Sequence, residues 1–509
     1  MSSDQVPKPD TEFIAHIPES GRAEDRKAWT REILLIVGAC VLLPLAIAYG
    51  FGSRDELQVS AMIVGVAFFT VALAQPFWGL IFFVALLYMR PEETVPALRG
   101  MHFTLIAAVV AAISVVFQKL MDREAPVKIP ANGLILGFGG IVVFSTLNKG
   151  GMGTAIQDVG RLVALVLMIC NLVRTPARFR SLYISIVVFT LYLAMFSVFR
   201  FYAGAAFNRG TLLQAEATGI FNDPNDLSAT IVAGLALALC RAVAEQGGRR
   251  LMYAVASVLM IWAIYLTNSR GGMLAMVGTI AAVALLYSRS RWVAVALVLL
   301  IGAGAVKLGP SRMHQLDTQE ESANSRFRFW HTGTLLFMAN PLTGIGYSQF
   351  PAVNNGFTAH NSFVLCYSEL GLPGYFCWMG LLYYAFRGLR RTPGGAANAA
   401  VRGSPAGDGE TRALGKAIAS QLSDETHDII GARLALAGFL LAAFWISRTY
   451  VPVLYLLIAL PLAHQIAYQG AGSDFSLVPR QRWIDAWSIL GLCVGSIAFI
   501  ALLAWKLRG

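Results

Sequence analysis

The stretch RSLYISIVVFTLYLAMFSVFR, residues 180–200, decides the fold class. It carries no charge between its terminal arginines, and a helix of this length crosses a hydrocarbon core about 30 Å thick. Similar apolar runs recur along the chain, near residues 32–51, 58–75, 77–89, 103–119, 130–147, 158–173, 180–200, 226–243, 250–267, 271–287, 291–307, 362–386, 430–447, 450–468 and 485–505. The sequence therefore predicts an all-α fold, a polytopic transmembrane helical bundle of roughly 14 or 15 spans. The break at Gln75-Pro76 leaves open whether the second and third runs form one helix.

The composition agrees with a membrane protein. Of the 509 residues, 56% are hydrophobic and 14% are charged, whereas soluble proteins carry roughly 25% charged residues. The net charge of +11 invites a nucleic-acid interpretation, but the excess lysine and arginine fall mostly in alternate short loops, as the positive-inside rule requires. No nucleic-acid module is visible, so nucleic acid is not an expected partner. The six cysteines lie in or beside apolar runs without a CxxC pair, which is typical of small buried residues.

The basic loops also predict how the chain is oriented and divided. The first thirty residues are polar and charged, unlike a cleaved signal peptide, and they precede the first span. The outer side then receives segments 201–225, 268–272 and 308–361. The predicted parts are a cytoplasmic tail at 1–31, transmembrane helices at 32–200, a core at 201–391 with a partly helical outer loop at 308–361 over an outward-facing cavity, a flexible cytoplasmic loop at 392–428, and transmembrane helices at 429–509.

Polar islands interrupt the apolar runs on the predicted outer side. The first holds Arg209 and the run GIFNDPND at 219–226, in which Asn225 or Asp226 can cap the helix that follows. A capped helix N-terminus at the outer interface is a natural anion site. A plain capped turn and an arginine that reaches the lipid headgroups explain the same residues equally well.

Two further islands carry arginine. In Thr267–Gly272 two apolar runs meet with almost no loop, so Arg270 lies at the membrane boundary and needs an anionic partner. Downstream, Arg326 and Trp330 are four residues apart on one helical face, with Arg328 between them. Headgroup contact, a structural salt bridge or a helix lying in the interface would account for these arginines without a ligand.

The fourth island is His360-Asn361, which opens an apolar helix that contains Glu369 and is broken by the glycines and the proline at 371–374. A lone histidine is more often structural than catalytic, but this one shares the predicted outer side with three arginine islands. Arginine grips diphosphate oxygens bidentately, and histidine accepts a proton near neutral pH. Together they indicate a reaction in which a nucleophile loses a proton while a diphosphate leaves, for which neither a metal nor another cofactor is required.

The spacing around this histidine carries a family resemblance. His360-Asn361 is followed by nine residues, then by Gly371, two more residues and Gly374. This pattern resembles the ligase motif of the O-antigen ligase and O-antigen polymerase superfamily, whose members transfer undecaprenyl-diphosphate-linked glycans in the bacterial inner membrane. The resemblance covers roughly residues 200–385 and follows the family's order of polar islands.

The resemblance implies a metal-independent glycosyl transfer on the periplasmic face that inverts the anomeric carbon. The core 201–391 would be the catalytic part, with 308–361 as its periplasmic loop. In this reading His360 activates the acceptor hydroxyl. The diphosphate would be gripped by Arg209, Arg270 and Arg326. The supporting residues would be Asn225, Asn361, Glu369 as a partner that orients His360 or an acceptor, and Arg328 as the rival of Arg326.

The acceptor stays open between lipid A core, as for a ligase, and a second lipid-linked glycan, as for a polymerase. The run Met89–Glu93 resembles ligase-like proteins of exopolysaccharide clusters and favours the polymerase. A transporter of polysaccharide or lipid-linked oligosaccharide is the alternative from another class, although transporters gather polar residues at the bilayer midplane. Convergence of the four islands on one outward cavity would favour the transferase.

Overall fold

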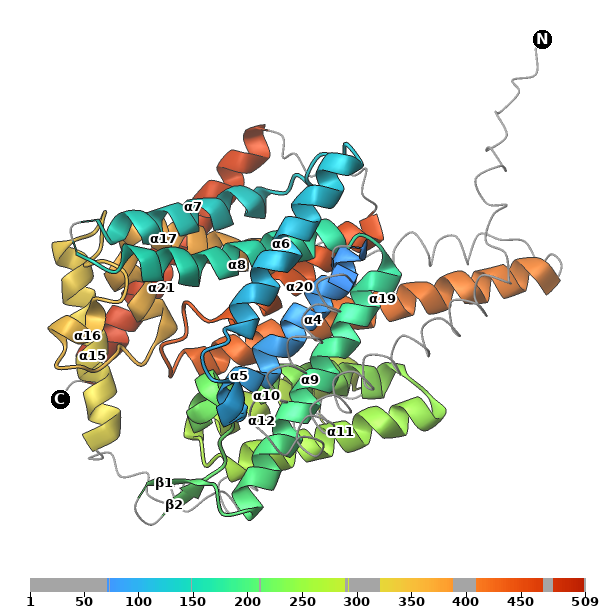
Figure 1. Ribbon diagram of the computed structural model, residues 1–509, viewed down its shortest axis with the longest axis horizontal. Coiled ribbons are helices and arrows are strands. Elements are labelled where there is room, and N and C mark those ends of the chain that lie inside the picture. The colour runs from blue at the N-terminus through green and yellow to red at the C-terminus, as the bar shows by residue number, and fades with distance from the viewer. Residues whose placement is uncertain are drawn as a thin grey trace, which may run out of the picture. The chain divides into compact units, whose positions relative to one another are not determined.

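The computed structural model describes residues 71–72, 74–147, 149–209, 212–288, 292, 321–387, 409–469 and 479–507 (Figure 1). All of them belong to one compact unit, Ala61–Gly509. The predicted N-terminal tail, the apolar runs 32–51 and 291–307, and most of the run 58–75 lie outside the described residues.

The predicted all-α bundle is confirmed, and the protein is a multi-pass membrane protein. Within the described part of the chain, eight helices are long and apolar enough to cross a membrane. They are α6 (Phe103–Met121), α8 (Met152–Leu172), α9 (Pro176–Tyr202), α10 (Pro224–Ala244), α11 (Gly247–Leu266), α12 (Arg270–Tyr287), α19 (Gly409–Ala443) and α21 (Pro479–Lys506). The other helices are α4 (Pro76–Met89), α5 (Pro91–Thr94), η3 (Pro96–Leu98), α7 (Pro130–Ser145), η4 (Gly219–Asn222), α15 (Glu321–Ala339), α16 (Phe350–Val353), α17 (Ser362–Arg387) and α20 (Pro452–Gln469).

Proline marks where several of these helices begin. It occupies the first helical position of α4, α7, α9, α10 and α20, where a missing N–H costs nothing. The question left open at Gln75-Pro76 is answered here: the chain is helical at 71–72, leaves helical geometry at Gln75 with φ −139°, and begins α4 at Pro76. The break is therefore real.

Helix α10 is the centre of the packing and is buried along most of its length. It contacts α9, α11, α12 and α19. Small residues let these helices approach closely: a Cβ on Gly234 would lie 2.3 Å from the Thr190 side chain of α9, and one on Gly438 would lie 2.6 Å from Thr279 of α12. By contrast, α6, α11 and α21 expose large apolar side chains, as helices that face lipid do.

An antiparallel hairpin adds a small exception to the helical fold. Strand β1 (Phe207–Arg209) pairs with β2 (Leu212–Gln214), and Arg209 stands opposite Leu212. Its second strand is fixed to the junction of α11 and α12, because Gln214 Nε2 donates to the Thr267 carbonyl over 2.9 Å and Asn268 Nδ2 donates to the Leu213 carbonyl over 2.7 Å. The hairpin therefore brings the backbone of Arg209 to the helix that begins with Arg270.

Helix α17 bends where the sequence predicts a break. Gly371 has φ 65° and ψ −171°, a region open essentially to glycine, and Pro373 offers no N–H to the turn before it. The carbonyls of Ser368 and Glu369, which this bend releases, accept hydrogen bonds of 2.9 Å from the backbone of Ile345 and Gly346. The loop after α15 thus donates hydrogen bonds to the carbonyls that the bend leaves without helical partners. Backbone groups inside a membrane need such partners.

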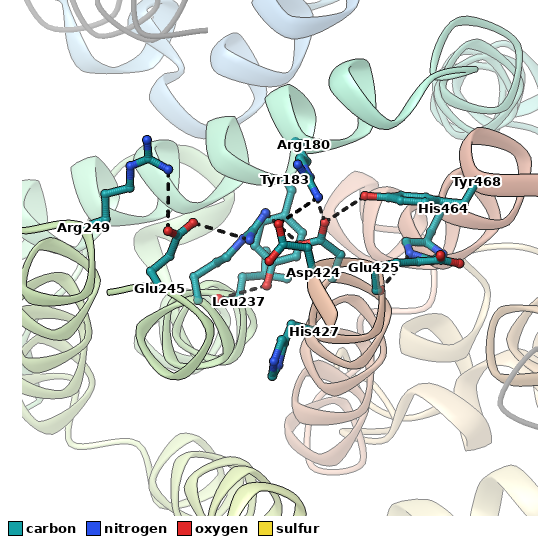
Figure 2. A network of polar contacts seen from close by, with 12 residues as sticks. Arg180, Tyr183, Leu237, Glu245, Arg249, Asp424, Glu425, His427, His464 and Tyr468 are labelled. Atoms are coloured by element: carbon teal, nitrogen blue, oxygen red, sulfur yellow. Dashed lines mark hydrogen bonds and ion pairs between the residues drawn. The ribbon is translucent and has the colours of Figure 1, made fainter. Parts of the chain in front are cut away.

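Ion pairs near the C-terminal end of α10 hold helix α19 in place (Figure 2). Asp428 is fully buried and lies 2.9 Å from Arg241 Nη2 of α10 and 3.5 Å from Arg180 Nε of α9. Tyr468 of α20 donates to Asp428 over 3.1 Å, and Asp424 pairs with Arg180 over 3.2 Å. These contacts join four helices.

The flexible loop predicted at 392–428 is too long. Residues 392–408 lie outside the described residues, whereas α19 begins at Gly409 and already includes the buried Asp428. Asp424 and Asp428, which the prediction placed in the loop, are instead the partners of Arg180 and Arg241. These pairings join residues far apart in the sequence, so the composition of the segment alone did not indicate them.

Candidate active site

The four polar islands meet at one end of the bundle, which we call the loop end. It is formed by residues 90–102, 149–158, 207–209, 212–226, 267–270, 325–330, 340–362 and 444–451. Among the helices that begin there are α10, α12 and α17. Their N-termini carry partial positive charge and unpaired N–H groups, both of which favour an anion.

The first contact joins the N-termini of α10 and α12. Ser269 caps α12 by accepting from Gly272 N over 3.1 Å, and its hydroxyl donates to Asn225 Oδ1 over 2.7 Å. Arg270 is the first residue of α12 and is half-buried. The helices come this close because a Cβ on Gly272 would lie 2.3 Å from the Ser228 hydroxyl. Asn225 therefore holds the turn that presents Arg270.

The predicted cap of α10 is corrected by the structure. Asp223, and neither Asn225 nor Asp226, accepts the hydrogen bond that caps the helix, from Asn225 N over 2.8 Å. Asn225 is thereby free to bridge to α12, and Asp226 is engaged by Arg448.

The His360-Asn361 pair forms the start of α17. Asn361 is fully buried and caps the helix, because its Oδ1 accepts from Phe363 N over 2.9 Å and from Val364 N over 3.1 Å. His360 has φ 48°, which is uncommon outside glycine, and is half-buried. Its ring stacks on Phe329 of α15 with centroids 6.0 Å apart. The cap and this stacking fix both the backbone and the ring of His360.

Helix α15 brings Arg326 to the same region. Arg326 precedes Phe329 by three residues, so the helix places it on the face on which His360 stacks. Arg328 is exposed and lies about 200° around the helix from Arg326, which puts it on the opposite face. Of the two rival arginines, the geometry favours Arg326. Trp330 is fully buried against Phe444 and Trp445, and it anchors the helix.

Arg448 is a central residue that the sequence reasoning missed. Its guanidinium pairs bidentately with Asp226 at the start of α10. The backbone N–H of Arg448 donates to Ser362 Oγ over 2.8 Å at the start of α17. Burial disfavours the charged form of Arg448, but the Asp226 carboxylate outweighs it and keeps the arginine pKa above its usual value. The signal was present: like Arg270, Arg448 is an arginine at a short junction between two apolar runs.

Two further bonds tie the same loop to α17. The Ser362 hydroxyl donates to the Ile446 carbonyl, and Thr449 Oγ1 donates to the Ser362 carbonyl, each over 2.7 Å. Together with Arg448 they couple the positions of the α10 and α17 N-termini. Arg270 and His360 are thus joined through a continuous set of contacts that runs from Ser269 and Asn225 along α10 to Ser362.

Glu369 supports the loop end from inside α17. Its carboxylate is almost fully buried, and it accepts from Phe350 N over 3.1 Å and from the Tyr450 hydroxyl over 2.9 Å. Both of its oxygens are therefore engaged by the segments on either side of α17. These contacts indicate that Glu369 holds the loops in place, and its role in orienting His360 or an acceptor stays a prediction.

Arg209 reaches the loop end through its backbone. Its strand pairs with β2, and Ala215, which follows β2, donates to the Leu266 carbonyl over 2.8 Å. The structure thus places all four predicted islands on connected segments. It describes half-buried side chains for Arg270, Arg326 and His360, and the backbone position of Arg209.

Comparison with known proteins agrees with this arrangement. The sequence model of the family described as O-Antigen ligase matches residues 255–379, about a quarter of the chain, which include Arg270, Arg326 and the whole His360–Gly374 motif. Arg209, Asn225 and Arg448 lie outside the match. No curated protein matches the sequence. The predicted resemblance to the O-antigen ligase superfamily is therefore confirmed for these residues.

Proposed function

We propose that the protein transfers a glycan at the loop end from undecaprenyl pyrophosphate to an acceptor hydroxyl. The observation that carries the proposal is the set of contacts from Asn225 through Arg448 to Ser362, which holds the helix starts bearing Arg270 and His360 at one end. The family of the matched domain agrees with glycosyl transfer in O-antigen or polysaccharide synthesis.

The proposed chemistry is a single displacement. His360 accepts the proton of the acceptor hydroxyl, and the oxygen attacks the anomeric carbon while the bond from that carbon to the diphosphate oxygen breaks. The leaving diphosphate gains negative charge, which Arg209, Arg270 and Arg326 offset together with the nearby helix N-termini. Attack opposite to the leaving group inverts the anomeric configuration. The proposal uses no cofactor and no metal.

The proposed location is the bacterial inner membrane with the loop end facing the periplasm. The opposite end of the bundle carries basic residues that the positive-inside rule assigns to the cytoplasm. They are Lys119, Arg174, Arg178, Arg249 and Arg387. This distribution supports an outward loop end, where lipid-linked glycans are assembled onto their acceptors.

The preferred acceptor in this proposal is lipid A core, which the resemblance of the His360–Gly374 motif to a ligase motif implies. A polymerase that extends a second lipid-linked glycan is favoured by one observation. The Arg90–Glu93 run packs directly on the Gly219 turn, where a Cβ would collide with the Glu93 carboxylate. The run that resembles exopolysaccharide proteins is therefore part of the loop end.

The decisive experiment uses purified full-length protein, an undecaprenyl-diphosphate-linked glycan, and either lipid A core or a second lipid-linked unit as acceptor. We expect one acceptor to give a longer or lipid-A-linked product, and His360→Ala to abolish it. Arg270→Lys should lose nearly as much activity as Arg270→Ala, since lysine lacks the bidentate fork. Arg250→Ala, an exposed arginine at the start of α11, is the matched control.

Two results would overturn the proposal. Undiminished transfer by His360→Ala would remove the general base. Movement of the intact lipid-linked glycan across vesicles, without any covalent product with either acceptor, would favour the transporter.

A further inference from the structure

A polar cavity lies beside the loop between α4 and α6. Its volume is about 490 Å³, within the range of small-molecule sites. It is lined by Arg90, Glu92, Glu93, Arg99, Gly100, His102, Thr104, Leu105 and Arg161. This lining is charged on several sides and more polar than apolar, so it suits a hydrophilic ligand better than a lipid chain.

The charges of the lining narrow the class of ligand. Arg90 pairs with Glu93, and Arg161 pairs with Asp158, whereas Arg99 is exposed and has no ion-pair partner among the residues that the structure describes. Two carboxylates in the wall disfavour a ligand of high negative charge such as a diphosphate. The same carboxylates can accept hydrogen bonds from hydroxyl groups of a ligand. Arg99 supplies one positive charge, which can pair with one acidic group of that ligand.

The cavity adjoins the candidate active site. Thr94, next to the lining, lies 3.0 Å from Thr218 between hydroxyl oxygens, and a Cβ on Gly219 would lie 2.6 Å from Arg90 Nη1. Only six residues separate Gly219 from Asn225, a length of chain that spans at most about 20 Å. The distance is shorter here because Gly219–Asn222 is a 3₁₀ helix. An oligosaccharide of a few rings bridges such a gap.

A second connection runs through Arg161. Its partner Asp158 accepts from the Tyr347 hydroxyl over 3.0 Å, and the Tyr347 ring packs edge-to-face on Tyr450 with centroids 4.8 Å apart. Tyr450 in turn donates to Glu369 in α17. The wall of the cavity is therefore attached to the helix that His360 precedes.

We propose that this cavity is the subsite for the acceptor glycan and that it recognises a sugar bearing one acidic group, such as a hexuronic acid. The inference rests on the proposed function for the identity of the glycan as acceptor, but not for its binding. Arg99 pairs with the acid group, and Glu92 and Glu93 accept hydrogen bonds from ring hydroxyls. Arg99 is a specificity-determining residue outside the diphosphate-binding and proton-transfer groups.

The test measures binding to purified full-length protein in detergent, with the disaccharide glucuronosyl-glucose as probe and its neutral counterpart glucosyl-glucose as reference. Because Arg99 gives the acid group a charge-assisted hydrogen bond, we expect the acidic probe to bind at least about tenfold more tightly. Arg99→Ala should bring the acidic probe down to the level of the neutral one. Arg250→Ala, which removes an exposed charge elsewhere, should leave the preference unchanged.

Three outcomes would overturn the inference. Equal binding of the two disaccharides by the unaltered protein would exclude recognition of an acid group. Retained preference in Arg99→Ala would exclude this cavity. Loss of inorganic pyrophosphate binding in Arg99→Ala would make the cavity a diphosphate site. Failure of the proposed function is distinguishable, because His360→Ala should abolish transfer and keep the preference for the acidic probe.

Discussion

Removal of Arg448 tests whether the loop end depends on the bridge between α10 and α17. In Arg448→Leu the Asp226 carboxylate, whose side chain is 9% exposed, loses its bidentate partner. Breaking a buried ion pair costs about 3–5 kcal/mol, but the Arg448 side chain is 31% exposed, so solvent replaces part of the interaction. We therefore expect a loss of about 2–3 kcal/mol in the free energy of unfolding.

The double variant separates the lost pair from the lost side chain. In Asp226→Asn/Arg448→Leu no charge is left buried, and we expect the loss to fall to about 1 kcal/mol. Unfolding by SDS, followed by circular dichroism, is measured for the unaltered protein, Arg448→Leu, Asp226→Asn and the double variant. The Arg448→Leu variant should also lose about 100-fold in glycan transfer, because the start of α17 shifts relative to Arg270.

Two results would refute this reasoning. If Arg448→Leu changed the free energy of unfolding by less than about 0.5 kcal/mol, the ion pair would contribute no more to stability than an exposed one. A double variant as unstable as the sum of the two single variants would show that Asp226 and Arg448 are not coupled.

Three further predictions concern the same architecture. Asn361→Ala should cost about 1 kcal/mol of stability through the lost cap, and steady-state kinetics should show a lower kcat because His360 loses its support. Gly371→Ala should cost about 1–3 kcal/mol and abolish transfer, since the new Cβ would lie 2.7 Å from the Leu342 carbonyl carbon; Gly140→Ala, where a Cβ meets open space, is its control. Asp428→Asn should lower the thermal stability through Arg241, yet leave the transfer rate per folded molecule unchanged, because this network lies at the opposite end of the bundle.

Much of the fold was predictable because hydrophobicity is a local property. Runs such as 180–200 and the bend at Gly371–Gly374 are visible in a short window of sequence. The hairpin of β1 and β2 was not, since three-residue strands leave no alternation to detect. The part of α19 around Asp424 and Asp428 was also missed, because the partners of these residues, Arg180 and Arg241, lie far away in the sequence.

The candidate site was predictable to a similar extent. Arg270 and His360 are conspicuous as polar residues among apolar ones, and the structure places both at the loop end. The contacts that hold these two residues in place were not visible in the sequence, since the bond from Arg448 to Asp226 joins residues 222 positions apart. The reassignment of the α10 cap from Asn225 to Asp223 has the same origin: only the position of Ser269 explains why Asn225 is used elsewhere.

The spacing between Asn361 and Gly371 has a physical reason in this arrangement. The first half of α17 is held at its start by the bonds of Ser362 to Ile446 and Thr449, and near its bend by the bond of Glu369 to Tyr450. Both anchors belong to the single segment 444–451, so the length of helix between them must match that segment. One inserted residue would rotate one anchor by about 100° relative to the other. The nine intervening residues therefore set the position of His360 against the loop that also holds α10.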